Sequence, residues 1–250
     1  MKINKFTKKK NGMYSITFEN NTSLLVHEEL ILKYDLLITK ELSLEKEEQI
    51  IKENLTYIGY DLAIKYITTK MRSKKEIEEY LHSNEIEEEK IKEILKKLEN
   101  NGYIDEQIYA ECFINDKLLL SIDGPTKIIK ELLSKGITRD IIDEKMTKYS
   151  EQIEIERIEK ISTKMINKNR NKSNYILKNK ILDYLSNLGY EKNLILSVID
   201  NLNFKENKDL AKKEYEKVYK KLSKKYSGKE LEYKIKQKMY SLGFNDFFAE

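Results

Sequence analysis

Residues 13–18 alternate apolar and polar side chains in the pattern of a β-strand. Tyr14, Ile16 and Phe18 fall on one face of an extended segment, because successive side chains of a strand point to opposite sides. The Asn-Asn pair at 20–21 can supply the positive φ of a tight turn, after which residues 23–27 can pair back. The pattern predicts a small N-terminal β-hairpin that packs on the helices after it.

Beyond Ser43, which is a favourable N-cap, apolar residues recur at the spacing of amphipathic helices. One helix ending is repeated: Glu85, Gly136, Gly189 and Gly243 are 51, 53 and 54 residues apart, each four positions after a Leu or Met and directly before an apolar residue. Glycine takes the left-handed conformation that ends a helix, and the next apolar residue folds back on the last turn. Because a helix precedes and follows each of these endings, the repeat predicts a three-helix module.

The chain is therefore predicted to be mostly α-helical, an elongated tandem array of three-helix modules with a small N-terminal β-hairpin region. The predicted divisions are residues 1–58 for the hairpin and a linking helix, 59–104 for module 1, 105–150 for module 2, 151–205 for module 3, and 206–250 for module 4, whose third helix is truncated.

Three sequence signals mark predicted helix starts within these modules. Ser73 with Glu76, and Ser227 with Glu230, read Ser-x-x-Glu, the capping box that precedes a helix. Asp105 is expected to cap the helix that opens module 2. These caps support the predicted modules independently of the apolar pattern.

The composition excludes several classes of chemistry. One Cys and two His leave no disulfide within the chain and no Cys-based zinc site. The sequence contains no Gly-rich phosphate-binding motif, and no apolar run reaches the roughly 18 residues of a membrane-spanning helix. We therefore expect a soluble, cytoplasmic, monomeric protein that is not an enzyme, does not bind a membrane, and holds no cofactor or metal.

The charge is unevenly distributed along the chain. Residues 1–125 carry 19 Lys or Arg and 24 Asp or Glu, whereas residues 126–250 carry 28 and 19. Two stretches, 157–180 and 205–238, concentrate the excess of positive charge. This asymmetry indicates a polyanion or an acidic protein as partner, although Lys-rich helices are also common as plain solvated surfaces.

Two strings carry a family signature: Lys-Met-Arg-Ser at 70–73 and Gly-Tyr-Ile-Asp-Glu at 102–106, each before a helix. Together with Gly-Pro at 124–125 and Lys-Gly-Ile at 135–137, they make the chain similar to the RecX family of bacterial recombination regulators over residues 60–142. The chain departs from the family pattern at three positions: Glu106 stands where a second Asp is usual, Lys70 where Arg is usual, and Glu85 where the first module often has Gly.

The resemblance implies a non-enzymatic protein of recombination and SOS DNA repair. Such a protein binds the helical groove of the RecA filament on single-stranded DNA and restrains the ATPase, strand-exchange and co-protease activities of RecA. A row of helical modules with a basic face is suited to follow a filament around a polyanion, either by touching the DNA or through RecA alone.

The candidate contacts are the basic residues of this face in the first three modules. They are Lys70, Arg72, Lys74 and Lys75 in module 1, Lys127, Lys130, Lys135 and Arg139 in module 2, and Lys164, Lys168, Arg170, Lys178 and Lys180 in module 3.

Two other functions stay open at this point. A protein that binds DNA without sequence preference and without RecA would explain the basic half of the chain. A helical-repeat scaffold for protein–protein contacts would explain the modules.

Overall fold

The computed structural model describes residues 1–169, 171–202, 204 and 208–248. Within these residues the chain forms thirteen α-helices, one short 3-10 helix and a three-stranded sheet. The predicted class, mostly α-helical with a small N-terminal β region, is confirmed.

The strands are β1 (Ile3–Lys8), β2 (Met13–Phe18) and β3 (Ser23–His27). The helices are α1 (Glu28–Lys33), α2 (Leu36–Thr39), α3 (Leu44–Thr69), α4 (Lys74–Ser83), α5 (Glu88–Asn100), α6 (Glu106–Leu120), α7 (Pro125–Ser134), α8 (Arg139–Met146), α9 (Glu151–Lys168), α10 (Asn174–Asn187), α11 (Lys192–Asp200), α12 (Lys208–Leu222), α13 (Gly228–Ser241) and the 3-10 helix η1 (Asn245–Phe248).

The chain divides into two compact units. One contains residues 1–112 and 132–141, and the other contains residues 113–131 and 142–250. The first unit holds the sheet and helices α1 to α5, and the second holds helices α9 to α13.

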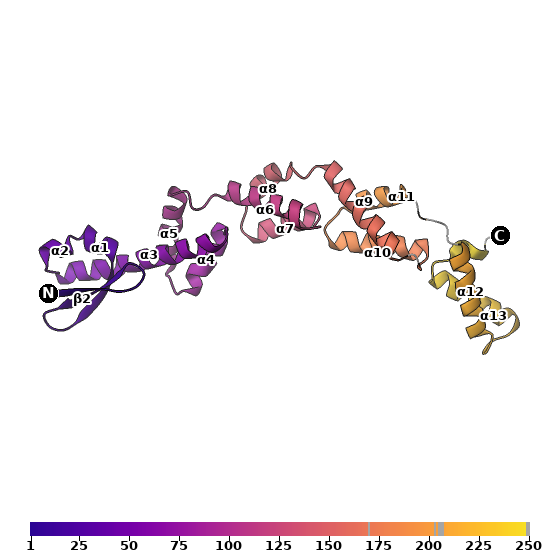
Figure 1. Cartoon of the computed structure of the whole chain (residues 1–250), viewed down its shortest axis with the longest axis horizontal. Helices are drawn as coiled ribbons and strands as arrows, with labels where there is room; N and C mark the ends of the chain where they lie inside the picture. The colour runs from indigo at the N-terminus through magenta and orange to yellow at the C-terminus, as the bar shows by residue number, and fades with distance from the viewer. Residues whose placement is uncertain (170, 203, 205–207, 249–250) are drawn as a thin grey trace. The chain divides into compact units, whose positions relative to one another are not determined.

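The N-terminal sheet is antiparallel in the order β1-β2-β3. The predicted strand alternation of β2 is confirmed, because Ile16 and Phe18 are buried and Tyr14 packs on the same core. The tight turn is also confirmed, with Asn21 at φ 64°. Strand β1 was not predicted, since its sequence Ile-Asn-Lys-Phe-Thr-Lys has no clean alternation. Strand β3 and helix α1 lie against α3 (Figure 1).

Helix α3 is continuous across the predicted boundary at residue 59, so module 1 as predicted begins inside a helix. It begins as predicted after Ser43, whose hydroxyl accepts a hydrogen bond from the Lys46 amide. Gly59 lies inside the helix rather than at its end. A Cβ there would lie 2.6 Å from Ile94 Cδ1, so the missing side chain lets α5 pack closely on α3.

The predicted repeat of helix endings is confirmed in all four positions. Glu85, Gly136, Gly189 and Gly243 have positive φ angles of 61°, 84°, 91° and 75°. In each case the amide of the next residue donates to the carbonyl four positions before the turn residue, and these acceptors are Leu81, Leu132, Leu185 and Met239. This is the hydrogen bond of a Schellman ending, which satisfies a carbonyl that the helix leaves without a partner.

Each of the three glycine turns packs against the start of the middle helix in the preceding module. A Cβ added to Gly136 would lie 3.1 Å from Lys75 Cβ, and one added to Gly189 would lie 2.6 Å from the Lys127 amide nitrogen. At Gly243 it would lie 2.4 Å from Ser173 Oγ. Glu85 occupies the same position in module 1 and is exposed, because no helical module precedes it. A side chain is therefore tolerated at Glu85, because no preceding module packs against this turn.

The helix caps agree with the sequence at two of three positions. Ser73 and Glu76 form the predicted capping box, and the Asp105 carboxylate accepts from the Ile108 amide at 3.0 Å. The predicted capping box at Ser227 is wrong, since its side chain makes no capping hydrogen bond. Gly228, the next residue, has a φ of 56°, so the chain does not enter the helix with the geometry that a Ser cap requires.

We expect Gly189→Ala to destabilise the protein more than Gly102→Ala. Both glycines have positive φ, so both variants carry the roughly 1–2 kcal/mol cost of a left-handed alanine. Only Gly189 has a close neighbour; a Cβ at Gly102 meets nothing within 4 Å. Overpacking should add about 1–3 kcal/mol to the Gly189 variant, measured as the free energy of unfolding in urea. Equal losses for the two variants would show that the turn at Gly189 is not packed against α7.

Candidate binding surface

The basic residues predicted in module 1 serve mainly the fold. The Arg72 guanidinium lies 4.0 Å from the centre of the Tyr66 ring, a stacked cation–π contact. Lys74 Nζ pairs with Glu99 at 2.6 Å, and Lys75 Nζ donates to the Ser134 carbonyl at 3.0 Å. Lys70 is exposed directly after α3 and makes no ion pair with the described residues.

Some of the predicted residues of module 2 also pair within the fold, and others are exposed. Lys127 pairs with Asp123 at 2.7 Å, and Lys135 pairs with Glu76 at 2.9 Å. Burial would raise the pKa of Glu76, but the hydrogen bonds from the Ser73 amide and Lys135 hold that pKa below its ordinary value. Lys130 and Arg139 are exposed, the first on α7 and the second at the start of α8.

In module 3 the structure brings three predicted residues to one groove. Lys164, Lys168 and Lys180 line it, from α9 and α10. Lys178 does not line the groove, because it pairs with Asp200 at 2.8 Å. Arg170 lies outside the described residues.

The groove has a volume of about 740 Å³ and runs between the end of α6 and helices α9 and α10. Its apolar lining consists of Leu118, Leu119, Leu120, Ile122, Ile161, Met165 and Tyr184. Its charged lining consists of Arg157, Lys160, Lys164, Lys168 and Lys180. No acidic residue is among the described side chains that line it. We call this feature the basic groove.

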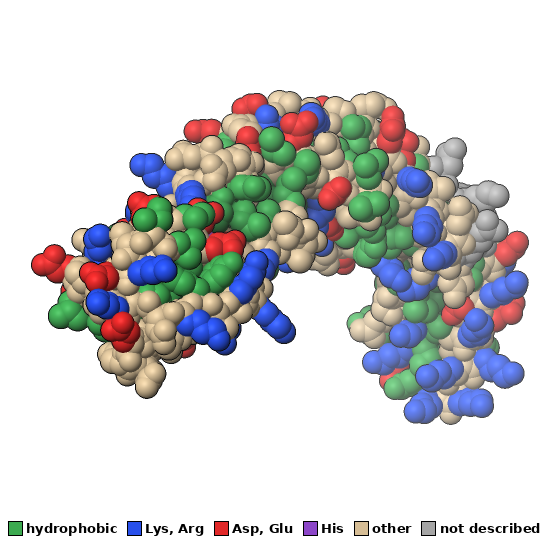
Figure 2. Space-filling model, turned by 60° about the vertical axis from the view of Figure 1, so that its left-hand side comes forward, with side chains coloured by type: hydrophobic (Ala, Val, Ile, Leu, Met, Phe, Trp, Pro, Cys, Tyr) green, Lys and Arg blue, Asp and Glu red, His purple; other side chains and the backbone are tan. Residues whose placement is uncertain are grey.

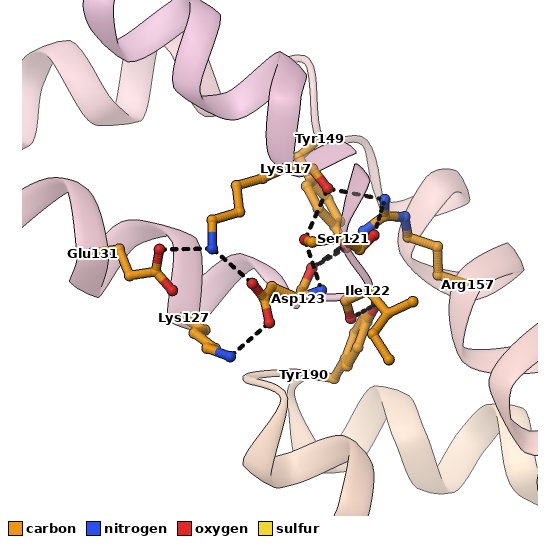
Figure 3. Close-up of polar contacts among 9 residues, drawn as sticks. All are labelled: Lys117, Ser121, Ile122, Asp123, Lys127, Glu131, Tyr149, Arg157 and Tyr190. Carbon is orange, nitrogen blue, oxygen red and sulfur yellow. Dashed lines mark hydrogen bonds and ion pairs between the residues drawn. The ribbon is translucent and has the colours of Figure 1, made fainter. Parts of the chain in front are cut away.

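Arg157 fixes the end of α6 to α9 and so builds one wall of the basic groove (Figure 3). Its guanidinium donates to the carbonyls of Leu118, Ser121 and Asp123, the last two at 3.0 and 3.2 Å. A helix leaves its last four carbonyls without intrahelical partners, and the planar guanidinium has enough donors to serve several of them. The wall therefore depends on one side chain from the next module.

A second set of contacts holds the segment after α6 from the other side (Figure 3). Asp123 accepts from Lys117 at 2.8 Å and from Lys127, and the Tyr190 hydroxyl donates to the Ile122 carbonyl at 3.0 Å. Burial would raise the pKa of Asp123, but the two lysine hydrogen bonds outweigh it and hold that pKa below its ordinary value. Asp123 is therefore a carboxylate at neutral pH.

Sequence reasoning missed Arg157 and Lys160 as groove residues. Both lie in the basic stretch 157–180, so the charge run was the available signal. The carbonyl acceptors of Arg157 lie more than 30 residues earlier, and no spacing rule relates them to it. Exposed lysines also cover α12 and α13, which Figure 2 shows as a concentration of blue side chains, and none of these was among the predicted contacts.

One group of described side chains has the composition of a metal site. Ligand atoms of Glu78, His82 and Glu88 all lie within 4.8 Å of one another, with His82 Nε2 3.0 Å from a Glu88 oxygen. All three are at least partly exposed; His82 pairs with Glu88, and Glu78 lies one helical turn before His82 on α4. The expectation that the protein holds no metal stays a prediction. None of the described helices is long and apolar enough to span a membrane.

Comparison with known proteins decides the family. The family model for the first three-helix domain of RecX matches residues 60–98, and that for the second matches residues 105–146. Regulatory protein RecX of Streptococcus pyogenes serotype M3 is 33% identical over 98% of this chain and 95% of its own length. The chain belongs to the RecX family.

Other RecX proteins agree with this assignment. Regulatory protein RecX of Listeria innocua is 30% identical over 83% of this chain and 79% of its own. A crystal structure of regulatory protein RecX superposes with a TM-score of 0.69, covering 80% of this chain and 99% of that one, at 24% identity. The structural likeness concerns the fold, which is thus a RecX fold.

We expect Arg157→Met to lower the free energy of unfolding by about 1.5–3 kcal/mol. Methionine keeps the length of the side chain but removes every donor, so the carbonyls at the end of α6 lose a charged partner. Lys160→Met is the matched control, because Lys160 is exposed one turn further along α9 and should change stability by less than about 0.5 kcal/mol. Urea unfolding measures both, and an Arg157 variant as stable as the control would remove Arg157 from this role.

Proposed function

We propose that this chain regulates the RecA recombinase in recombination and SOS DNA repair. It binds RecA filaments on single-stranded DNA, slows ATP hydrolysis and strand exchange and limits co-protease activity, and it catalyses no reaction itself. The observation that carries the proposal is the match, over almost the whole chain, to relatives named regulatory protein RecX. The models for the first and the second three-helix domain of RecX match this chain.

The geometry supports the basic groove as the main contact surface. Arg72, Lys74, Lys127, Lys135 and Lys178 already have partners within the fold. The cations that remain for a partner are the exposed ones, Lys70, Lys130, Lys164, Lys168 and Lys180. Three of these five line the basic groove, whose described lining residues include no acid. A positive surface with no acidic side chain among its described lining residues attracts a filament of protein and DNA, and salt should weaken that attraction.

Sequence-independent DNA binding without RecA is a second candidate. The exposed lysines of α12 and α13 favour it, because a dense set of cations on neighbouring helices binds phosphates without reading bases (Figure 2). A RecA regulator should change RecA activity even when RecA already covers the DNA. A protein that only binds DNA should not.

The test is the rate of DNA-dependent ATP hydrolysis by RecA with this protein titrated in at low salt. We expect the wild-type protein to slow hydrolysis, and the double variant Lys164→Glu with Lys168→Glu to need at least roughly fivefold more protein for the same effect. Lys46→Glu with Lys52→Glu is the matched control, since both lysines are exposed on α3 and the charge change is the same.

Two outcomes would contradict the proposal. If the wild-type protein leaves RecA hydrolysis unchanged at low salt but shifts single-stranded DNA in a gel, DNA binding alone is the function. If both double variants lose inhibition equally, the effect follows net charge and not the basic groove.

A further inference from the structure

We infer that the basic groove binds a short amphipathic helix of a partner protein and not a strand of nucleic acid. One face of this helix carries leucines, and acidic residues flank that face. The inference rests on the proposed function only because both assign binding to the basic groove. It adds which kind of protein segment the groove recognises.

The floor of the groove is aliphatic and open to solvent. Leu119 and Leu120, at the end of α6, are 80% and 83% exposed, and Ile122 beside them is 47% exposed. Apolar side chains that are exposed together in a groove lined by lysines suit an amphipathic protein partner. Bases stack on aromatic rings, and Tyr184 is the single aromatic side chain among the described lining residues. The lining therefore suits apolar anchors better than bases.

Helix α9 supplies two parallel stripes to the groove. Ile161 and Met165 form an apolar stripe, and Lys160, Lys164 and Lys168 form a basic stripe beside it at four-residue spacing. Eight residues of helix rise about 12 Å, which is the length of two turns of another helix. An amphipathic helix bound in a groove presents its anchors at the same i, i+3, i+4 and i+7 spacing.

The positive charge of the groove lining indicates that the partner segment carries negative charge. Five cations line the groove, including Lys180 on the α10 side, and no described lining residue is acidic. Arg157 is engaged with the carbonyls at the end of α6, so four lysines are left to face an occupant. A helix with Glu or Asp on the flanks of its apolar stripe would pair with these lysines from both sides.

The experiment measures fluorescence anisotropy of a labelled synthetic peptide with the full-length protein. The probe is a helix of about 14 residues with Leu at i, i+3, i+4 and i+7 and Glu at most other positions. A second peptide keeps the Glu residues and replaces each Leu by Ser. We expect the leucine peptide to bind at least roughly tenfold more tightly than the serine peptide. We also expect oligothymidine of equal charge to compete poorly for the site.

The groove variant is Leu119→Ser with Leu120→Ser, and it should weaken leucine-peptide binding at least roughly tenfold. Both side chains are exposed, and an unchanged thermal melt will show that the fold is retained. Leu37→Ser with Ile38→Ser is the matched control, because these neighbours are also exposed, on α2, and should leave binding unchanged.

Three outcomes would overturn the inference. They are equal binding of the leucine and serine peptides, equal loss of binding in both double variants, and displacement of the peptide by oligothymidine at matched charge. The last result would assign the groove to nucleic acid. RecA hydrolysis assayed in parallel separates the two proposals, since inhibition that persists without peptide binding rejects this inference and leaves the proposed function standing.

Discussion

A left-handed turn at the end of each middle helix is the contact on which the rest of this structure depends. At Gly189 the turn comes so close to α7 that a Cβ would overlap the backbone of Lys127. The close approach lets the Leu188 carbonyl accept from the Gly124 amide at 2.7 Å, and the Gly189 carbonyl accept from the Thr126 amide at 3.1 Å. The turn at Gly189 thus ends α10 and also supplies acceptors to amides at the start of α7. Amides in the first turn of a helix otherwise lack partners.

The same junction places the surface that we assign to binding. Once α10 is set against α7, the Tyr190 hydroxyl reaches the Ile122 carbonyl, and Arg157 on α9 reaches the carbonyls at the end of α6. These bonds hold Leu119 and Leu120 in solvent beside the lysines of α9, which is the composition of the basic groove. The basic residues that hold the junction together are therefore different from those that are exposed to a partner. Arg157 and Lys127 build the junction, whereas Lys164 and Lys168 face outward from it.

The sequence predicts local features of this chain well, because they are set by residues close together. The turns at Gly136, Gly189 and Gly243 and the cap at Ser73 each follow from a few neighbouring side chains, and the structure confirms them. The Ser227 cap fails for an equally local reason, the left-handed Gly228 that follows it.

Contacts between distant residues could not be predicted in the same way. Sequence reasoning counted Lys135 among the contacts of a basic face, but its partner Glu76 lies 59 residues earlier. Similarly, the predicted module boundary at residue 59 falls inside α3, where Gly59 lets Ile94 of α5 pack closely. The basic groove itself combines side chains from three helices, so no single stretch of sequence contains it.

Hydrogen exchange by NMR at the Thr126 amide tests the junction most directly. Thr126 is the second residue of α7, and Asn193 holds the same position in α11, where its amide has no acceptor among the described residues. The account predicts that Thr126 exchanges at least about 100-fold more slowly than Asn193, after correction for intrinsic rates, because the Gly189 carbonyl binds its amide hydrogen. Equal protection of the two amides would contradict the account, since the glycine turn would then not be joined to the preceding module.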